Sequence, residues 1–550
     1  MPTKSRFDTD VLIVGSGPIG LTLALDLAAR GVRTLVVEQR AREDNRRVKC
    51  NHISARSMEI FRRLGVARAL RDHGLPADHP NDCAFRTTFT GQEIARIPIP
   101  ARQDRYTARY GPDTWWPTPE PPHRINQIYM EPILWDYAAA QDNITIWAEA
   151  DFVSFSQDQE MVTGEIRSAG DYGPESVTAR FLMGCDGGRS EIRRAIGAEF
   201  VGDAVVQRVQ SSYIRAPKLL EMSNYPPAWG TINLNPRRSG TLYAIDGKET
   251  FLVHNYLRPD ETDFDAIDRD WSIRTILGVD DSFEYELISN EDWIGRRLVA
   301  DKFRQDRVFI CGDAAHIWVP YAGYGMNAGI ADAANLAWLL AAHINGWAPY
   351  SILDAYEKER LPITEQVSHF AMNHAHEMIK NRRRVPADIE EESPAGAASR
   401  AEFGQELYDL NVQQYCCGGL NFGYYYDQSP LIIYDDEPQP SYSMANFTSS
   451  TVPGCRLPHF WLPTGHSLYD IIGGDYALLR FDREADVKPL LDAAAAAGVP
   501  LQLVELEPFG APTAYTTRLV LARPDQHVAW RGDDLPEEVA AMIATITGRA

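Results

Sequence analysis

A glycine-rich turn between a strand and a helix restricts this chain more than any other feature of its sequence. The turn reads Gly15-Ser16-Gly17-Pro18-Ile19-Gly20, and the apolar run Val11–Val14 before it predicts a short buried strand. The apolar stretch from Ile19 to Ala29 predicts a helix. A second apolar run, Thr34–Val37, predicts another strand. The first forty residues are therefore expected to form a βαβ unit.

The glycines of this turn have separate roles in binding a dinucleotide. Gly15 permits the tight turn, Gly17 lets the backbone approach a pyrophosphate, and Gly20 allows close packing of helix against strand. The helix N-terminus, which includes Pro18, then faces the phosphates. Glu38 ends the second strand, where an acid binds a ribose 2′-hydroxyl and disfavours a 2′-phosphate. FAD or NAD is expected here; the alternative is a structural turn in a nucleotide-free domain.

Length and composition limit the remaining possibilities. A chain of 550 residues is too long for one core and suggests about three domains. The formal net charge of −22 argues against nucleic acid or an anionic membrane as partner. Seven cysteines without a CxxC pair form neither a disulfide framework nor a zinc site, so we expect no metal and a cytoplasmic location. No signal peptide and no membrane-spanning apolar stretch are evident.

A second motif decides between FAD and NAD. Gly312-Asp313-Ala314-Ala315-His316 follows the apolar run Val308–Cys311, and Gly323-Tyr324-Gly325-Met326-Asn327 precedes a predicted helix. An aspartate at a strand end, here Asp313, can bind a ribitol hydroxyl. The loop amides at the helix start can bind the pyrimidine edge of an isoalloxazine, and the helix dipole favours the negative charge that develops there on reduction. FAD is therefore the expected cofactor.

These residues resemble the single-component (class A) FAD-dependent aromatic hydroxylases, the group of p-hydroxybenzoate and phenol hydroxylases. Pro320, Gly325, Met326 and Asn327 match the family's pattern. The chain departs from it in three places, where Val319 replaces a proline, Ala322 a glycine and Tyr324 a glutamine.

Two further segments extend the resemblance. Gly184-Cys185-Asp186-Gly187 matches the family's Asp-Gly motif, which implies that Asp186 contacts FAD and the reducing nicotinamide cofactor. Gln127, ahead of Met130–Leu134, corresponds to a glutamine that touches the flavin. The chain contains only one dinucleotide fingerprint, so the resemblance implies that NADPH or NADH docks transiently as the reductant.

The resemblance also predicts the architecture. We expect an α/β fold in which a Rossmann-like FAD-binding domain (about 1–80, 120–200 and 295–385) is interleaved with a β-sheet substrate domain (about 80–120 and 200–295). Residues 386–450, rich in Pro, Glu, Ser and Tyr, are interpreted as a linker. Residues 451–550 resemble the thioredoxin-like C-terminal domain of the phenol hydroxylase branch, carried by Pro453–His459 and Arg523–Arg531. This domain is expected to be structural or to form a homodimer.

The implied reaction is the hydroxylation of a phenolic ring by a C4a-hydroperoxyflavin, with NAD(P)H and O2 as co-substrates. A free phenol has a pKa near ~10, so the site must supply roughly 4 kcal/mol or a base to form the phenolate. The family places an acid or a histidine before the second helix. Without a gap, Asn51 falls on the family's aspartate position, and with one gap His52 falls on the histidine found in some relatives. An amide cannot act as a base, so His52 is the candidate. A histidine that merely packs or caps a helix is the alternative.

Three further residues complete the candidate catalytic set. Tyr243 and Tyr256 lie on the hairpin expected over the flavin and could bind the phenol oxygen, although strand aromatics more often only pack. Pro320 lies at the reactive face. A second enzyme reading is a tailoring oxygenase that acts on a polyketide or fused aromatic by hydroxylation or Baeyer–Villiger chemistry. A flavin-bound scaffold without turnover is disfavoured by the retention of Asp313, Pro320 and Asn327.

Overall fold

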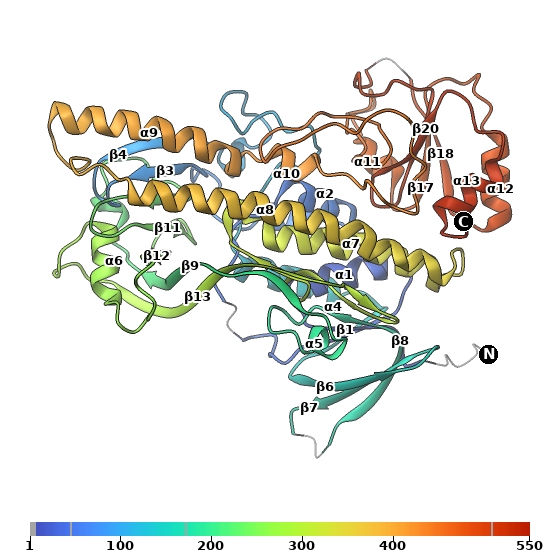
Figure 1. The fold of residues 1–550 in the computed structure, drawn as a ribbon, viewed down its shortest axis with the longest axis horizontal. Coiled ribbons are helices and arrows are strands. Elements are labelled where there is room, and N and C mark those ends of the chain that lie inside the picture. Colours follow the sequence, from blue (N-terminus) through green and yellow to red (C-terminus); the bar gives the residue numbers. More distant parts are fainter. Residues whose placement is uncertain (1–6, 45–46, 171–172, 508–509) are drawn as a thin grey trace.

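The computed structural model describes residues 7–44, 47–170, 173–507 and 510–550, and the strands within them form three sheets (Figure 1). The first sheet has the order β14-β15-β8-β1-β2-β5, and β6 and β7 extend it beside β8. Its strands are β1 (Thr9–Val14), β2 (Thr34–Val37), β5 (Ile144–Trp147), β6 (Ala150–Gln157), β7 (Val162–Ser168), β8 (Glu175–Gly184), β14 (Arg304–Gln305) and β15 (Val308–Ile310).

Parallel pairing brings the predicted motifs to one edge of this sheet. β1 pairs in parallel with β2 and β8, and β15 pairs in parallel with β8. The carboxyl ends of these strands therefore lie side by side. The amide of Gly15 donates to the carbonyl of Val37 at 2.8 Å, and the amide of Cys311 donates to that of Gly184 at 3.0 Å. Motifs far apart in the sequence thus meet at the carboxyl edge, where open parallel sheets bind ligands.

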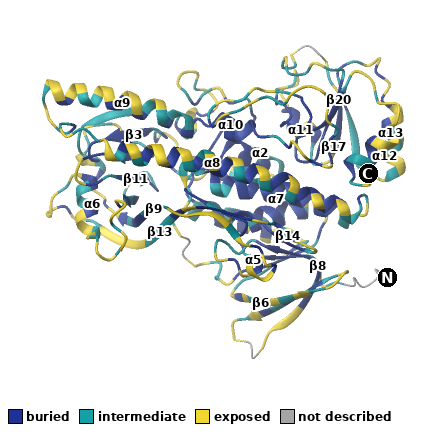
Figure 2. Ribbon diagram, viewed as in Figure 1, coloured by how far each residue is buried: buried dark blue, intermediate teal, exposed yellow. Residues whose placement is uncertain are grey.

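Helices cover this sheet and extend beyond it. They are α1 (Pro18–Ala29), α2 (Ala55–Arg63), α3 (Ala67–Arg71), α4 (Gln127–Ala139), α5 (Glu191–Ala195), α6 (Arg269–Leu277), α7 (Tyr324–Ile344), α8 (Ala355–Arg383), α9 (Pro394–Tyr415), α10 (Gly418–Phe422), α11 (Leu468–Ile472), α12 (Lys488–Ala497) and α13 (Val539–Ile546). Short 3-10 turns are η1 (Arg102–Asp104), η2 (Leu220–Met222), η3 (Gly312–Ala314), η4 (Tyr321–Gly323) and η5 (Tyr350–Asp354). Figure 2 shows α7 buried along most of its length, because it packs between α1, the sheet and the C-terminal part.

The second sheet has the order β16-β13-β9-β12-β11-β10-β3-β4. Its strands are β3 (Cys83–Arg86), β4 (Glu93–Ile97), β9 (Phe200–Arg215), β10 (Gly230–Asn233), β11 (Gly240–Ala244), β12 (Thr250–Tyr256), β13 (Glu286–Ala300) and β16 (His316–Trp318). One face packs Leu242, Phe251 and Val253 with apolar residues of α6. The opposite face carries the predicted tyrosines.

The hairpin expected to carry Tyr243 and Tyr256 is formed by β11 and β12 and turns at Asp246-Gly247. β11 and β12 pair antiparallel, with Leu242 opposite Val253. The carboxylate of Asp246 accepts hydrogen bonds from the backbone amides of three turn residues at 2.9–3.0 Å. This Asx-type capping explains why the sequence turns at this point.

The C-terminal hundred residues form the third sheet, β18-β17-β19-β20. Its strands are β17 (Tyr476–Arg480), β18 (Leu501–Glu505), β19 (Leu519–Ala522) and β20 (Val528–Gly532), of which β17 and β18 are parallel. Helices α12 and α13 pack on it. The predicted α/β class, with interleaved sheets and a separate C-terminal sheet, is confirmed. The domain boundaries stay a prediction.

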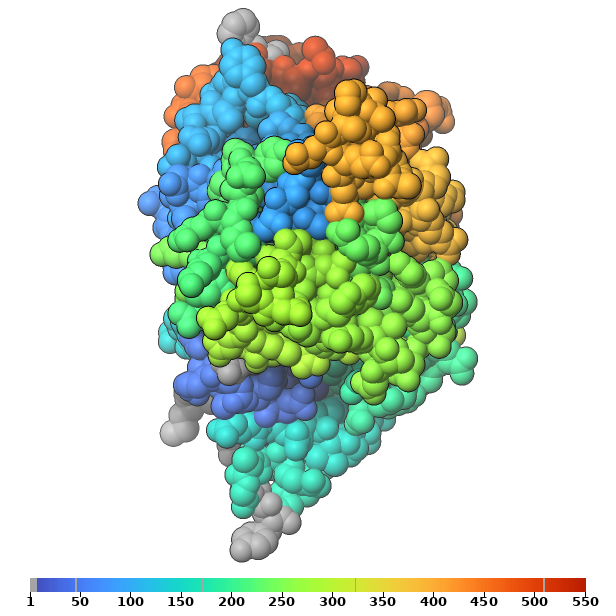
Figure 3. Space-filling view, turned by 90° about the vertical axis from the view of Figure 1, so that its left-hand side faces the viewer, coloured from blue at the N-terminus to red at the C-terminus, as the bar shows by residue number. Residues whose placement is uncertain are grey.

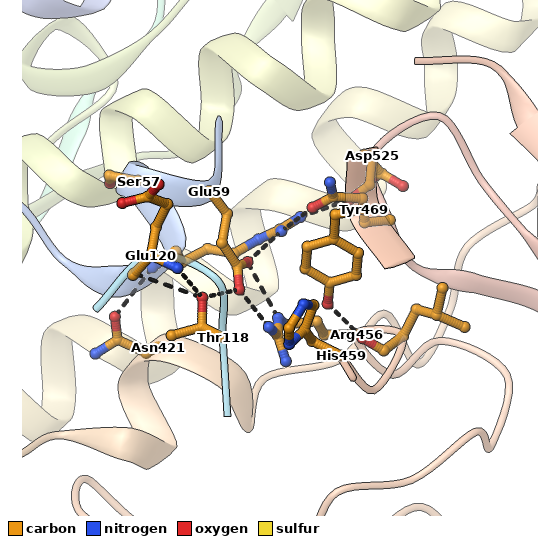
Figure 4. Close-up of polar contacts among 12 residues, drawn as sticks. Ser57, Glu59, Thr118, Glu120, Asn421, Arg456, His459, Tyr469 and Asp525 are labelled. Carbon is orange, nitrogen blue, oxygen red and sulfur yellow. Dashed lines mark hydrogen bonds and ion pairs between the residues drawn. The ribbon is translucent and has the colours of Figure 1, made fainter. Parts of the chain in front are cut away.

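Buried ion pairs fasten the C-terminal part to the rest of the molecule. Arg523, fully buried, donates to Glu359 of α8 at 2.6 and 2.8 Å and to Asp525 at 2.8 Å. Figure 4 shows a second cluster, in which Arg456 reaches the buried carboxylate of Glu59 on α2. The hydroxyl of Thr118 donates to the same carboxylate at 2.7 Å.

The structure corrects the interpretation of residues 386–450 as a plain linker. The 22 residues of α9 fill much of this segment, with Ser393 as the N-cap. A Cβ on Gly404 would come within 2.3 Å of the Ile94 carbonyl, so α9 lies directly against β4. The buried side chains of α9 recur every three or four residues among acidic and polar ones. The overall composition of residues 386–450, on which the linker interpretation rests, does not reveal so sparse an apolar stripe.

No helix in the described residues is long and apolar enough to cross a bilayer.

The Arg523 contact predicts a large effect on stability. Arg523→Met should shift the urea unfolding midpoint by the equivalent of about 3–5 kcal/mol, because Glu359 and Asp525 would remain buried without a counter-charge. Arg518 is the matched control, since it also contacts two carboxylates, Asp482 and Asp534, but at the surface. Arg518→Met should cost about 0–1 kcal/mol. Equal midpoints for the two variants would contradict this assignment.

Candidate active site

The glycine turn leaves an open space beside the first turn of α1. Gly15 has φ of +103°, and a Cβ there would lie 2.4 Å from the Cys185 carbonyl oxygen. A Cβ on Gly20 would lie 2.0 Å from the Gly15 carbonyl oxygen. Gly17, by contrast, has nothing within 4 Å of a built Cβ and an ordinary φ of −67°. Protein packing therefore requires glycine at 15 and 20, whereas Gly17 faces free space.

The first turn of α1 is suited to bind an anion. Its N-cap, Gly17, offers no side-chain cap, Pro18 follows directly, and the first turn contains no acidic residue. The free N–H groups of such a turn bind phosphate. This arrangement fits the pyrophosphate of FAD.

Glu38 lies beside this turn as an anion. Its carboxylate accepts hydrogen bonds from the Ser16 amide at 2.9 Å, the Ser16 hydroxyl at 2.7 Å and Arg40 Nε at 2.8 Å. Burial raises the pKa of Glu38, but the hydrogen bond and charge of Arg40 and the bonds from Ser16 outweigh it and hold the pKa at about 2. The group is therefore an acceptor over the whole working pH range, as a ribose hydroxyl requires.

Asp186 also fits a ligand at this edge. One carboxylate oxygen accepts the amides of Glu191 and Ile192, which caps α5. The other oxygen is buried and has no hydrogen-bond partner among the described residues. A buried unpaired acceptor is rare in native proteins and favours a donor from a bound molecule.

The two aspartates of the second motif region have different surroundings. Asp313, in η3, is exposed, and its carboxylate receives no hydrogen bond from the described part of the chain. Asp332 of α7 is fully buried and accepts from the Gly312 amide at 3.2 Å, His316 Nε2 at 2.7 Å and Arg360 Nε at 2.8 Å. Asp313 is thus available for a ligand, while Asp332 holds the loop that presents it.

Asn327 connects the second motif to the segment before α2. Its side-chain amide donates to the carbonyls of Gly323 (2.6 Å) and His52 (3.1 Å), and its oxygen accepts from the Ser54 amide at 2.8 Å. The side chain is therefore used within the protein, and contact with a flavin would come from the backbone at the start of α7. This helix has no side-chain N-cap.

The neighbours of Asn327 line the same loop. Gly325 and the half-buried Met326 begin α7, and Pro320 is exposed just before η4. The three departures from the family pattern lie here. Val319 is buried in an apolar cluster, and the Tyr324 hydroxyl donates to the Leu420 carbonyl of α10. Tyr324 thereby ties the loop to the segment that had been interpreted as a linker.

The structure places His52 against this loop. A Cβ on Gly323 would lie 3.1 Å from the Cβ of His52. Neither ring nitrogen of His52 bonds to a residue in the described part of the chain, and the side chain is buried. Burial, and then the charges of Arg124 and Arg105, lower the pKa of His52 well below its ordinary value, so the imidazole is neutral at pH 7. Gln127 lies near the His52 segment, because its backbone N–H donates to the Cys50 carbonyl at 2.9 Å.

An antiparallel bridge explains why Arg124 lies next to His52. The bridge joins Ile53 and His123 through two backbone hydrogen bonds of 2.9 Å. In such a bridge the flanking residues, here His52 and Arg124, face each other.

Aromatic rings line the second sheet beside this segment. We call this surface the aromatic face; it comprises Trp229, Tyr243, His254, Tyr256, Trp293 and Tyr415. Neighbouring ring centroids are 5.0–6.5 Å apart. Burial raises the pKa values of Tyr243 and Tyr256, so both hydroxyls stay protonated. The Tyr256 hydroxyl lies 3.1 Å from that of Thr241, whereas no residue in the described part of the chain bonds to the hydroxyl of Tyr243.

A groove of about 1220 Å³ opens at the outer end of the aromatic face. Tyr256 and Arg382 are among its lining residues, and Arg382 stacks 4.3 Å over the Tyr256 ring. Arg382 also donates to the hydroxyl of Tyr321, in η4, at 3.1 Å. The groove therefore adjoins the loop of the second motif. Figure 3 shows that residues near 80–100, 200–290 and 390–415 share this end of the molecule.

Sequence reasoning missed several of these residues. Asp332 could have been flagged, since a charge in the middle of the apolar helix α7 needs a partner. Its partner Arg360 lies on α8, where it is one charge among many. Nothing in the sequence marks Arg124, Trp229 or Arg382, because their importance comes from contacts between distant segments. Among the described residues no group of three or more potential metal ligands occurs.

Comparisons with known proteins agree with this geometry. Residues 8–371 match the family described as FAD binding domain, and residues 450–550 match the C-terminal domain of aromatic-ring hydroxylases. The FAD-dependent monooxygenase apdD of Emericella nidulans is 30% identical, over 100% of this chain and 92% of its own. Phenol 2-monooxygenase from a Pseudomonas species is 27% identical, over 96% of this chain and 90% of its own. The structure of the rebeccamycin biosynthetic enzyme RebC with reduced flavin superposes with a TM-score of 0.89, at 32% identity and full coverage of both chains.

The glycine turn gives a paired prediction. Gly17→Ala should leave the unfolding midpoint unchanged, because the methyl group enters free space at an allowed φ. It should weaken FAD binding at least about tenfold, or ~1.4 kcal/mol, by separating the backbone from the pyrophosphate. Gly20→Ala should instead destabilise the protein by about 1–3 kcal/mol through overpacking. Fluorescence titration with FAD and thermal unfolding distinguish the two, and unchanged FAD affinity in Gly17→Ala would place the cofactor elsewhere.

A second pair compares the aspartates. Asp313→Ala should reduce FAD retention by about 1–3 kcal/mol without affecting the stability of the FAD-free protein, since a ligand hydroxyl loses its acceptor. Asp332→Ala should lower the stability of the FAD-free protein, because three buried donors lose theirs. If Asp313→Ala holds FAD as tightly as the wild type, the assignment of this motif is wrong.

Proposed function

The chain belongs to the FAD-dependent aromatic-ring hydroxylases, and from this premise we propose that it hydroxylates a phenolic ring with NAD(P)H as reductant. One observation carries the proposal: the unbonded ring of His52 lies against the loop of the second motif and opposite Arg124, which stacks on Trp229 of the aromatic face. A phenol held there would lie between a hydrogen-bond acceptor and the flavin loop.

FAD, when bound, takes electrons from NAD(P)H and uses them to activate O2. The first turn of α1 and Glu38 would hold its pyrophosphate and ribose, and Asp313 its ribitol chain. The amides at the start of α7 would face its pyrimidine edge. Pro320, whose carbonyl accepts from the Gly323 amide, would border the reactive face.

His52 is proposed to act on the phenolic proton. Its neutral imidazole can accept a hydrogen bond from the phenol, while the positive charges of Arg124 and Arg105 favour the phenolate. The same charges lower the pKa of His52, so its imidazolium readily releases the proton that it takes from the phenol. Tyr243 and Tyr256 remain protonated and would donate hydrogen bonds to the substrate oxygen.

A fused aromatic substrate is the second candidate, and the size of the groove supports it. At about 1220 Å³ the groove exceeds the usual range of ligand pockets, about 300–1,000 Å³, and far exceeds one phenol ring. Similar proteins include aklavinone-11 hydroxylase, solved in complex with FAD and aklavinone, and a tetracenomycin B2 monooxygenase-dioxygenase. The reaction on such a ring system would be hydroxylation or a Baeyer–Villiger step, with the same residues in the same roles.

Assembly and location stay predictions: a homodimer through the C-terminal part, in the cytoplasm. Size-exclusion chromatography with light scattering tests the first.

A substrate screen tests the proposed function. Phenols of one to four rings should stimulate NAD(P)H oxidation by the FAD-loaded protein, and the product should gain one oxygen atom by mass. NAD(P)H oxidation that no aromatic compound stimulates, or that yields only hydrogen peroxide, would contradict the proposal.

His52 gives the sharpest prediction about the chemistry. His52→Ala should keep FAD and fold but slow single-turnover hydroxylation by about 10²–10⁴-fold near neutral pH, the range for general acid–base groups. Raising the pH toward the phenol's own pKa should restore part of the rate, since the substrate then arrives ionised. Because the pKa of His52 is lowered, the wild-type rate should show no step near pH 6.5.

His79 is the control for that experiment. It is another buried histidine with a lowered pKa, but its ring bonds to the Pro80 carbonyl on a separate loop. His79→Ala should leave the single-turnover rate and its pH profile unchanged. Parallel pH profiles for His52→Ala and the wild type would remove His52 from the chemistry.

A further inference from the structure

Arg124 is a buried cation without a counter-ion. Its side chain is 7% exposed, and its guanidinium carbon lies 4.1 Å from the Trp229 ring centroid and 5.9 Å from that of Tyr415. No residue in the described part of the chain accepts a hydrogen bond or forms an ion pair with it. All five N–H donors of the group are thus uncommitted within the described residues.

The acid that acts most strongly on Arg124, Asp113, already has another partner. Asp113 forms a buried ion pair with Arg105, and its other oxygen accepts from Trp116 Nε1 at 2.6 Å. Asp113 is therefore already compensated by one cation, and Arg124 adds a second. Other buried arginines have a carboxylate partner, among them Arg56, Arg71, Arg86, Arg238, Arg297, Arg360 and Arg523. Buried Arg193 has no carboxylate within ion-pair distance among the described residues, but it donates to the carbonyls of Gly188 and Ala314.

A buried charge without a partner is strongly unfavourable, and stacking on an aromatic ring offsets only part of that cost. The position of Arg124 suggests what compensates it. It lies opposite His52 across the bridge and against Trp229 and Tyr415, at the inner end of the aromatic face. A molecule bound on this face would meet the guanidinium edge.

We propose that Arg124 binds a carboxylate of the aromatic substrate, so that the enzyme acts on an aromatic acid; this rests on the proposed function. A carboxylate is already ionised at neutral pH, whereas a phenol must first lose a proton against a pKa of about 10. Two carboxylate oxygens also match the planar guanidinium fork. Such a ligand supplies the missing negative charge without any proton transfer.

The groove beside Tyr256 has the complementary charge for an acidic ligand. Its lining includes two acidic residues, Asp260 and Glu377, and seven lysines and arginines, namely Arg208, Arg237, Arg238, Arg258, Lys380, Arg382 and Arg383. This excess stands against a formal net charge of −22 for the whole chain. A cleft of this sign attracts anions and raises their association rate.

A matched pair of probes tests the proposal on the FAD-loaded protein. The probes are 3-hydroxybenzoate and 3-hydroxybenzamide, which differ in the carboxylate, and binding is read from the change in flavin absorbance without NAD(P)H. The wild type should bind the acid at least tenfold more tightly than the amide. Arg124→Gln should abolish this preference and keep its FAD. Arg518→Gln, at a surface arginine outside the groove that pairs with Asp482 and Asp534, should retain it.

A wild type that binds the acid no better than the amide, at any strength, would overturn the proposal. So would loss of FAD from Arg124→Gln, because Arg124 would then belong to the cofactor site. The probe assay needs no turnover. A retained preference without any hydroxylation would therefore refute the proposed function alone, and hydroxylation without the preference would refute the role of Arg124 alone.

Thermal unfolding gives a second, ligand-independent measurement. Arg124→Met should unfold at the same or a higher temperature than the wild type in the absence of probe, because it removes an uncompensated buried charge. Addition of 3-hydroxybenzoate should raise the midpoint of the wild type but not of the variant. A lower midpoint for Arg124→Met without probe would mark Arg124 as a structural residue and overturn the proposal.

Discussion

The buried carboxylate of Asp332 sets the path of the loop on which the whole site depends. A fully buried carboxylate must find donors, and it takes them from three elements: the Gly312 amide of η3, His316 of β16 and Arg360 of α8. Burial alone would raise the pKa of Asp332. The charges of His316 and Arg360 outweigh this effect and lower the pKa, so the group stays ionised. His316 in turn stacks on Trp318 with ring centroids 4.7 Å apart. The positions of Asp313 and Pro320 follow from these contacts.

The C-terminal part supports the same site from the opposite side. Arg56, near the start of α2, reaches the Gln526 side chain and the Asp525 carbonyl, and its amide donates to Asn421 at 3.2 Å. Since α2 begins three residues after His52, these bonds fix the segment that carries the candidate base. The buried ion pairs between Arg456 and Glu59 and between Arg523 and Glu359 add to this support. A module without redox cysteines can thus matter for chemistry through the geometry of α2.

Local sequence signals predicted the elements that local physics determines. The turn at Gly15–Gly20, the strand before it and the β11–β12 hairpin depend on backbone conformation and alternation over a few residues. Helix α9 was missed because only three of its buried residues, Phe403, Leu407 and Tyr415, are large and apolar. Arg124 was missed for another reason: its role depends on the bridge between Ile53 and His123 and on Trp229, more than a hundred residues away. No window along the chain contains these contacts.

The charge at the candidate site is positive, whereas the whole chain has a formal net charge of −22. His52 and the titratable groups of the aromatic face are kept neutral: burial lowers the pKa of His52, lowers that of His254 to about 4, and raises those of Tyr243 and Tyr256. Arg124 therefore contributes a positive charge that no neighbour cancels. In a region of low polarity such a charge acts over several ångströms with little screening. The field stabilises an anionic substrate group most, and it also stabilises a phenolate that forms beside that group. The charge of Arg124 would therefore serve both substrate binding and activation of the phenol.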